Sequence, residues 1–399
     1  MTDDAGDDKA LSTRLIHHAY EPPAGFMAPQ PGVFKASTVI FKDVAAMRAR
    51  DWRSKSGYTY GLHGTPTTFM LEERMATVES GRHCLLVPSG LASIALVNQS
   101  LLSQGDEVLL PDNVYGPSLA LARGELARWG ITHRVYDPLD LDAAVALMGP
   151  RTRLLWIEAP GSVTMEFPPL AALAAAARER RITVAMDDTW GSGMAFQPFE
   201  QGADVVIQAM TKYPSGGGDV LMGAIVTRDD RLHERLKLTH MRLGLGVAGN
   251  DAEAVLRALP SLELRFHAQA ASGMALAQWL VTRDECAAVL HPALPGAPGH
   301  ENWLAHCRIA AGLFSVLIDE RYAARQVDRF VEALRLFCIG YSWAGSTSLV
   351  VPYNLALIRD EKQRQRRYLK GHLVRFSIGL EAVEDLRADL SQALSVLRA

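Results

Sequence analysis

The sequence predicts an α/β protein with a large, mostly parallel sheet and a smaller α+β unit at its C-terminus. From about residue 66, short apolar runs alternate with helical patterns, which favours parallel strands joined by helices. From about residue 250 the helical content rises, and a proline- and glycine-rich loop follows at 292–299. The 399 residues allow two or three domains. We therefore expect an N-terminal arm over 1–65, a large domain over 66–259 and a small domain over 260–399.

The first 65 residues show weak periodicity and contain several residues that break regular structure. These prolines and glycines are Pro22, Pro23, Gly25, Pro29, Pro31 and Gly32. Such a cluster is typical of loops, so we expect an extended arm and not a packed layer.

The large domain is expected to alternate strands and helices in order along the chain. Apolar runs predict strands at 85–87, 108–110, 135–136, 154–157, 182–186, 205–207 and 224–226. Helical spacing predicts helices at 91–102, at 118–129, and from Pro168 to about Arg180, where proline is tolerated in the first turn.

The composition indicates a globular protein and excludes several other classes. The chain is 48% hydrophobic and 21% charged, with a net charge of -3, so nothing suggests binding to nucleic acid or to an anionic membrane. No apolar run is long enough to cross a bilayer, and the acidic N-terminus does not resemble a signal peptide, so we expect a cytoplasmic protein.

Two further patterns are interpreted as structural. The cysteines are far apart and without ligand spacing, so we expect buried, reduced thiols and no metal site at Cys84, Cys286, Cys307 and Cys338. The basic run at 364–367 is expected to be a solvated face.

Lys212 and Asp187 point to a cofactor. Lys212 stands in a glycine-rich loop between two strand-like runs, and Asp187 ends another such run. A lysine amine can form a Schiff base with an aldehyde, and a carboxylate can keep a pyridine nitrogen protonated. Pyridoxal 5'-phosphate (PLP) chemistry requires both groups. A solvated loop lysine is the alternative for Lys212 alone.

The segment Pro88-Ser89-Gly90-Leu91 joins a predicted strand to a predicted helix. Free N–H groups at a helix N-terminus bind anions, so a cofactor phosphate would fit at Gly90 and Leu91. The hydroxyl of Thr211 could reach the same phosphate. An ordinary strand-to-helix turn is the alternative.

Asp187 and Asp188 are adjacent acids at a strand end. Neighbouring residues on a strand point to opposite faces, so we expect one acid to face the site and the other to face away. That argues against a shared metal ion, and helix capping by Asp188 or Thr189 is the alternative.

Two further side chains are candidates for ligand binding. Tyr115 follows a predicted strand at the edge where open parallel sheets bind ligands, so it could stack on a flat cofactor. Arg375 stands inside an apolar, strand-like segment, where a buried guanidinium suits a substrate carboxylate. A surface tyrosine and an internal ion pair are the respective alternatives.

Two longer motifs make the pattern more specific. One is Glu158-Ala159-Pro160-Gly161-Ser162-Val163-Thr164-Met165-Glu166, and the other is Tyr341-Ser342-Trp343-Ala344-Gly345. Together with the residues above, they resemble the Cys/Met-metabolism family of PLP enzymes over nearly the whole chain. The second motif resembles the tryptophan-containing form found in the cystathionine β-lyase branch, whereas γ-lyases and γ-synthases usually carry Ser-Leu-Gly.

The resemblance implies an aspartate-aminotransferase-like fold (fold type I), with a mostly parallel seven-stranded sheet in the large domain. It also implies a role for each matching residue. Lys212 would form the Schiff base, Asp187 would pair with the pyridine nitrogen, and Tyr115 would stack on the ring. The cofactor phosphate would bind at Gly90, Leu91 and Thr211, with Ser162 nearby. The substrate would bind at Arg375, Ser342 and Trp343.

The sequence departs from the family pattern at three places. The usual Tyr-x-Arg is Tyr60-Gly61-Leu62, so an arginine expected to reach a neighbouring subunit's phosphate is missing, and His63 or Arg53 is a candidate replacement. Asp188 replaces the usual asparagine, and 216–218 are three glycines where Gly-His-Ser is common.

The resemblance implies β-elimination of L-cystathionine to homocysteine, pyruvate and ammonia in a homo-oligomer, expected to be a tetramer of two dimers, with Tyr60 entering the neighbouring site. Lys212 would remove the Cα proton, and Lys212 or Tyr115 would protonate the departing sulfur. Two alternatives stay open. One is another PLP enzyme, such as a γ-synthase, γ-lyase or sulfhydrylase, and the other is a non-catalytic binding protein on this scaffold.

Overall fold

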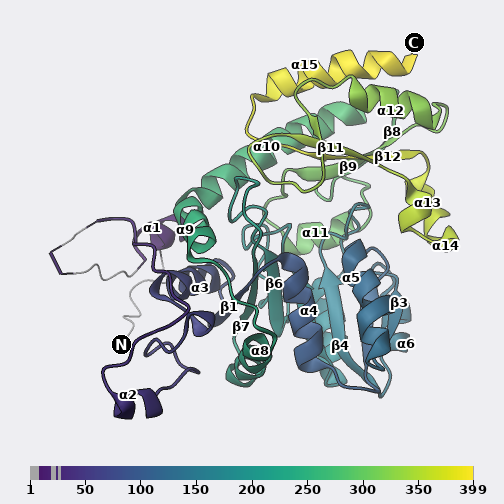
Figure 1. The fold of residues 1–399 in the computed structure, drawn as a ribbon. Coiled ribbons are helices and arrows are strands. Elements are labelled where there is room, and N and C mark those ends of the chain that lie inside the picture. The colour runs from purple at the N-terminus through teal and green to yellow at the C-terminus, as the bar shows by residue number, and fades with distance from the viewer. Residues whose placement is uncertain (1–8, 19–23, 26–27, 399) are drawn as a thin grey trace.

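The computed structural model describes residues 9–18, 24–25 and 28–398, and these form a larger and a smaller sheet region (Figure 1). The larger sheet has seven strands in the order β1-β7-β6-β5-β4-β2-β3. Its strands are β1 (His83–Val87), β2 (Glu107–Pro111), β3 (Thr132–Tyr136), β4 (Thr152–Glu158), β5 (Thr183–Asp187), β6 (Val205–Ala209) and β7 (Gly223–Thr227). This confirms the predicted fold class.

Pairing in this sheet is parallel except around β7, which runs antiparallel to both β1 and β6. The connection from β6 to β7 is a loop without a helix, so the chain turns back on itself instead of crossing over. That loop carries Lys212, which is therefore placed at the carboxyl end of β6.

Helices cover both faces of the larger sheet, as a mostly parallel sheet requires. They are α3 (Pro66–Val78), α4 (Gly90–Leu101), α5 (Gly116–Leu121), η3 (Ala122–Leu126), α6 (Leu141–Leu147), α7 (Leu170–Glu179), α8 (Asp230–Leu243) and α9 (Gly249–Ala258). Alternate strand residues enter opposite cores: Leu86 belongs to the core on the α3 side of the sheet, and Leu85 to the core on the side of α4 and α8.

The sequence explains where two of these helices begin. The Thr65 side chain accepts a hydrogen bond from the Thr68 backbone, and Pro66 occupies the first turn of α3. The Ser89 side chain accepts a hydrogen bond from the Ala92 backbone at the start of α4. The helix that we expected over 118–129 is not a single α-helix, because α5 is followed directly by the π-helical segment η3.

The smaller sheet has five strands in the order β10-β11-β12-β9-β8. They are β8 (Cys286–Leu290), β9 (Leu313–Ile318), β10 (Cys338–Ile339), β11 (Leu349–Tyr353) and β12 (His372–Ser377). Its helices are η4 (Leu259–Ser261), α10 (Leu262–Val281), α11 (His300–His306), α12 (Ala324–Glu332), α15 (Val383–Leu394) and η6 (Ser395–Arg398). Figure 1 shows α10 running from the larger sheet region to the smaller one. The domain boundaries near residues 65 and 259 stay predictions.

The segment before α3 is only partly an extended arm. It contains α1 (Leu11–Ile16), α2 (Val44–Arg48) and η2 (Gly61–His63). Leu15 is 1% exposed and belongs to the main core, so this part of the arm is packed. Pro22 and Pro23 lie outside the described residues.

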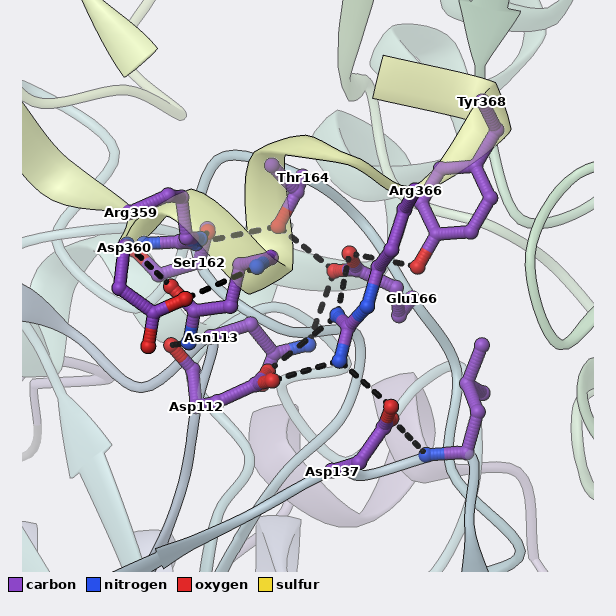
Figure 2. A network of polar contacts seen from close by, with 12 residues as sticks. Asp112, Asn113, Asp137, Ser162, Thr164, Glu166, Arg359, Asp360, Arg366 and Tyr368 are labelled. Carbon is purple, nitrogen blue, oxygen red and sulfur yellow. Dashed lines mark hydrogen bonds and ion pairs between the residues drawn. The ribbon is translucent and has the colours of Figure 1, made fainter. Parts of the chain in front are cut away.

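A connection between β11 and β12, residues 354–371, reaches from the smaller sheet down to the larger one. It contains α13 (Leu355–Ile358), α14 (Glu361–Arg364) and η5 (Arg367–Leu369). We call residues 354–371 the strap. Figure 2 shows how its side chains meet those of the loops that follow β2, β3 and β4.

Arg366 of the strap is the centre of this contact (Figure 2). Its Nη2 lies 2.6 Å from Asp112 Oδ2 and 2.6 Å from Asp137 Oδ2, and its Nη1 lies 3.6 Å from Glu166 Oε1. The expectation of a solvated face over 364–367 is therefore wrong at Arg366, because a single guanidinium here offsets several partly or fully buried carboxylates. Arg364 is exposed as expected.

One further expectation from the sequence concerns the four cysteines. Cys84 is buried, but Cys338 is exposed on the short edge strand β10, so the expectation of four buried thiols is wrong there.

Among the described residues, no helix is long and apolar enough to cross a membrane.

Replacing Arg366 with methionine should destabilise the fold, because Asp112 and Glu166 would lose the cation that offsets their burial. We expect the midpoint of thermal unfolding to fall by about 5 °C or more, as for loss of one partner of a buried pair. Arg364→Met is the matched control, since Arg364 is exposed on the same strap. Calorimetry measures both, and equal small changes in the two variants would contradict this role.

Candidate active site

A cavity of about 1230 Å³ lies where the carboxyl ends of the larger sheet's strands face the smaller sheet. Its volume is ample for a cofactor together with a substrate. Ten of the predicted site residues line it: Lys212, Asp187, Gly90, Leu91, Tyr115, Thr211, Ser162, Arg375, Ser342 and Trp343. Tyr60 does not line this cavity and is 46% exposed elsewhere on the chain.

Lys212 is the amine at the centre of the cavity. Its Nζ donates a hydrogen bond to Ser342 Oγ at 2.8 Å and lies 5.4 Å from the centroid of the Trp343 ring. Burial, reinforced by the positive charge of Arg375, lowers the pKa of Lys212 to about 8, while Asp187 acts in the opposite direction. A substantial fraction of this amine is therefore neutral and nucleophilic near pH 7.5.

The backbone of Lys212 is fixed by its neighbour. Tyr213 is 1% exposed, and its ring contacts Phe266 of α10 and Trp343. The Tyr213 hydroxyl accepts a hydrogen bond from the Gly312 backbone N–H, and Arg265 donates to the Tyr213 carbonyl. Both sheet regions therefore hold the lysine in place.

Asp187, the last residue of β5, is held by Thr189. The backbone N–H and the hydroxyl of Thr189 both donate to Asp187 Oδ1, at 3.0 and 2.5 Å. Burial raises the pKa of Asp187, and the Thr189 hydrogen bonds partly oppose that shift. Within the described residues Oδ2 has no hydrogen-bond partner, so it is available to a protonated ring nitrogen.

Asp188 faces the other way, as the alternation of side chains along a strand led us to expect. It is fully buried against Glu79, and burial raises the pKa of Asp188 well above its ordinary value and that of Glu79 to about 7. Asp188 Oδ1 and Glu79 Oε2 both lack a donor among the described residues. One proton shared between the two carboxyls satisfies both oxygens.

The N-terminus of α4 opens into the cavity and provides an anion site. Ser89, Gly90 and Leu91 all line it. A Cβ atom at Gly90 would lie 2.5 Å from Ala209 Cβ, so only glycine allows the helix to start this close to β6. The free N–H groups of the first turn therefore face the space beside Thr211, where they can hold a phosphate.

Arg375, on β12, is a buried cation without an ion-pair partner among the described residues. It is 8% exposed, donates to the Ser342 carbonyl at 3.2 Å, and lies 5.3 Å from the centroid of the Tyr353 ring. A desolvated guanidinium with donors to spare is a seat for a carboxylate.

Tyr115 is held at the cavity by its backbone. Its N–H donates to Glu158 Oε2 at 2.7 Å, and Glu158 is a buried carboxyl whose pKa burial raises well above the ordinary range. Burial, with a smaller contribution from the charge of Asp187, also raises the pKa of the Tyr115 phenol. The ring is therefore a neutral, flat surface at neutral pH.

Sequence reasoning missed three parts of the site. Tyr353 beside Arg375 gave no signal, because its role depends on which residue lies across the fold. Thr189 was considered only as a helix cap, although it donates to Asp187, two positions before it. The strap also lines the cavity, through Leu357, Ile358, Arg359, Asp360 and Gln363. Its clustered charges were visible in the sequence, but not the carboxylates that they meet.

The proposed replacements for the missing arginine at Leu62 do not line this cavity. Arg53 forms an exposed ion pair with Glu234 at 3.2 Å, and His63 Nδ1 lies 2.8 Å from the Thr59 hydroxyl. Neither residue reaches the phosphate site of its own chain.

The residues present fit PLP. The cavity offers an activated amine at Lys212, an anion site at the start of α4, and a half-buried carboxylate at Asp187 with one oxygen unsatisfied. These correspond to the aldehyde, the phosphate and the ring nitrogen of the cofactor. Arg375 remains for a substrate carboxylate.

Comparisons with known proteins agree on one family. A family model described as "Cys/Met metabolism PLP-dependent enzyme" matches residues 12–395. The cystathionine β-lyase of Bordetella avium is 38% identical over 97% of this chain and 98% of its own. The cystathionine γ-synthase of Mycobacterium bovis is 32% identical over 99% of this chain and 100% of its own. A crystal structure of metB from Corynebacterium glutamicum superposes with a TM-score of 0.88 at 27% identity, covering 98% of this chain and 99% of the other.

Loading of PLP onto the apoprotein should depend on pH through the Lys212 amine. Because the neutral amine is the nucleophile and its pKa is about 8, the rate of loading should rise with pH, with its midpoint near pH 8. Arg375→Leu removes a positive charge that lowers this pKa, so the midpoint should move to higher pH. Stopped-flow absorbance follows loading, and borohydride trapping with peptide mapping verifies the site. An identical midpoint in both proteins would contradict the assignment.

Proposed function

Because the chain belongs to the Cys/Met metabolism PLP-dependent enzymes, we propose that it is a carbon–sulfur β-lyase that cleaves L-cystathionine to homocysteine, pyruvate and ammonia. The observation that carries the proposal is Trp343. It lies against the Lys212 amine, in the motif whose tryptophan resembles the β-lyase form. The relative from Bordetella avium, named a cystathionine β-lyase, supports it further.

The cofactor and the protein divide the chemistry. When bound, PLP supplies an electrophilic aldehyde and a ring that withdraws electrons from the substrate Cα. Asp187 would keep the ring nitrogen protonated, the α4 N-terminus and Thr211 would hold the phosphate, and Tyr115 and Ser162, which also line the cavity, would contact the cofactor.

Arg375 and Lys212 act on the substrate. Arg375 binds the α-carboxylate, and because its guanidinium also contacts the Ser342 carbonyl, the carboxylate is fixed relative to the Lys212 amine. Lys212 Nζ accepts the proton from Cα in its neutral form, and the lowering of its pKa to about 8 increases the fraction of that form. The same amine, or the Tyr115 hydroxyl, then gives a proton to the departing sulfur, which leaves as a thiol.

The test of the function is the identity of the product. The alternative is γ-synthase, γ-lyase or sulfhydrylase chemistry, which the relative named cystathionine γ-synthase favours. Purified holoenzyme should release pyruvate from L-cystathionine, measured with lactate dehydrogenase. Release of 2-oxobutyrate instead would replace β-elimination by γ-elimination. A preparation that binds no PLP at all would favour a binding protein.

Arg375→Leu should lose about 2–5 kcal/mol of transition-state binding, as expected when one partner of a desolvated charge pair is truncated. PLP should still bind, since no phosphate or ring contact is assigned to Arg375. Steady-state kinetics give the change in kcat/KM, and the absorption spectrum verifies that PLP is bound. An unchanged kcat/KM in a PLP-loaded variant would rule out the role.

We also propose a homo-oligomer, a tetramer of two catalytic dimers, in which Tyr60 contacts the cofactor phosphate of a neighbouring subunit. Two observations support it. Tyr60 is 46% exposed and far from its own cavity lining, and large apolar side chains stand exposed at the cavity rim, with Leu221 at 71% and Tyr341 at 80%. Exposed apolar rims of this kind are typical of surfaces that pair with a partner.

Mixing two inactive variants tests the shared site. Tyr60→Ala and Lys212→Ala should each be inactive alone. After subunit exchange, pyruvate release should recover, because a mixed dimer contains one site with an intact Lys212 and a Tyr60 supplied by its neighbour. Exchange is verified by mass spectrometry of differently labelled subunits. No recovery despite proven exchange would mean that each site is built from one chain.

A further inference from the structure

The cavity is larger than the space around Lys212. Beyond Tyr115, its lining includes residues of α5 and η3 and residues of the strap. Leu119 and Val135 line it from the larger sheet region, and Leu357 and Ile358 line it from the strap. We call this region the far lobe. A thioether held at Arg375 must direct its sulfur substituent away from Lys212, and the far lobe provides room for that substituent.

Most charged residues that line the cavity already have a partner or a role. Lys212, Asp187 and Arg375 surround the reacting end. Glu158 accepts from the Tyr115 N–H, and Asp112 is paired with Arg366. Arg359 donates to the Ser162 carbonyl at 2.6 Å and to the Thr164 hydroxyl at 3.0 Å. Arg123 and Asp360 remain, and they have opposite charges.

Arg123 belongs to the π-helical segment η3. It is exposed, lines the cavity, and has neither a hydrogen bond nor an ion pair among the described residues. A π-helical turn inserts one residue and redirects the side chains beside it, and such turns recur at functional sites. Arg123 therefore presents an unpaired guanidinium at the far lobe, and a carboxylate is the ligand that suits it.

Asp360 is an exposed residue of the strap whose carboxylate caps α14 (Figure 2). Its Oδ1 accepts the Gln363 N–H at 2.8 Å, while Oδ2 has no partner in the described part of the chain. Gln363 donates to the Asp112 carbonyl, and the adjacent Arg359 anchors the strap to the loop after β4. A carboxylate fixed in this way, with one free oxygen at the cavity, suits an ammonium group.

We propose that Arg123 and Asp360 bind the second amino-acid head of the substrate, Arg123 its carboxylate and Asp360 its ammonium group. L-Cystathionine has an amino-acid head at both ends, and Arg375 binds only the one that reacts. The proposal rests on the β-lyase function given above. It makes Arg123 and Asp360 specificity-determining residues that separate cystathionine from cysteine thioethers with an uncharged sulfur substituent.

The test uses four substrates that differ only in the far head. L-Cystathionine has both groups, S-(3-carboxypropyl)-L-cysteine lacks the amine, S-(3-aminopropyl)-L-cysteine lacks the carboxylate, and S-propyl-L-cysteine lacks both. Pyruvate release gives kcat/KM for each with the PLP-loaded enzyme. The measured quantity is the ratio of each value to that for S-propyl-L-cysteine, so that a general loss of activity cancels.

Arg123→Met removes the charge and keeps the aliphatic stem. It should lower the ratio about three- to tenfold for the two substrates that carry the far carboxylate, and not for the aminopropyl compound, as expected for a solvent-accessible charge contact. Arg123→Lys should restore part of the ratio. Arg128→Met is the control, since Arg128 is exposed on the same stretch but pairs with Glu125 and does not line the cavity.

Asp360→Asn keeps the amide-accepting oxygen that caps α14 and removes the charge. It should lower the ratio for the two substrates that carry the far amine, and not for the carboxypropyl compound. Glu361→Gln is the control, because Glu361 is an exposed neighbour outside the cavity lining.

Three results would overturn the assignment. The first is that the kcat/KM ratios are unchanged in both variants, and the second is that they change equally for all three charged substrates. Either would show that Arg123 and Asp360 do not bind the far head. The third is an effect of the same size in the control variants, which would show that the overall charge near the cavity matters and not a specific contact with the substrate. If the wild-type enzyme releases pyruvate from S-propyl-L-cysteine, these results refute only the far-head assignment. If it releases pyruvate from none of the four, the proposed function fails and the assignment fails with it.

Discussion

The site depends on burying the Lys212 amine beside a second cation, Arg375. Lys212 follows β6 and Arg375 lies on β12 of the other sheet, so the pair exists only because the two sheet regions meet. Burial and the charge of Arg375 lower the pKa of the amine to about 8, so that a fraction of it is neutral at physiological pH, whereas Asp187 acts in the opposite direction. At the reacting end of the cavity, Lys212 and Arg375 face one carboxylate, Asp187. The cofactor phosphate and the proposed substrate carboxylate would add negative charge beside these two basic groups.

Holding Lys212 and Arg375 in register requires a rigid junction between the sheet regions. The main core continues from the larger sheet through Phe266 of α10 to Leu313 of β9, so packing makes one part of the junction. The strap makes another, because Arg366 brings its charge to carboxylates that follow separate strands of the larger sheet. The ion pairs of Arg366 are directional, whereas the apolar packing is not. They therefore fix the position of the strap, which lines the cavity.

Local patterns were sufficient for the fold class and for the residues at strand ends. Apolar runs predicted all seven strands of the larger sheet. Strands buried on both faces are continuous in hydrophobicity, whereas the half-buried edge strand β3 gave only the short run at 135–136. The antiparallel direction of β7 could have been anticipated only from the missing helix after β6. Arg366 and Tyr353 were out of reach, since a solvated arginine and an ion-paired one have the same sequence signature. Such roles are set by what lies across the fold, not by neighbours along the chain.

The departure at Asp188 shows how far the second layer of the site can vary. Behind Asp187 the chain places a carboxyl where the resembling family usually has an amide, and the position contacts Glu79 and the Gly193 N–H. An asparagine there would donate to Glu79 through its own N–H. A carboxylic acid does the same with a shared proton, provided that burial keeps the pair from losing it. The raised pKa values of both groups meet that condition near neutral pH. A shared proton can thus take the place of an amide N–H at this position, while Asp187 keeps its carboxyl group at the cavity.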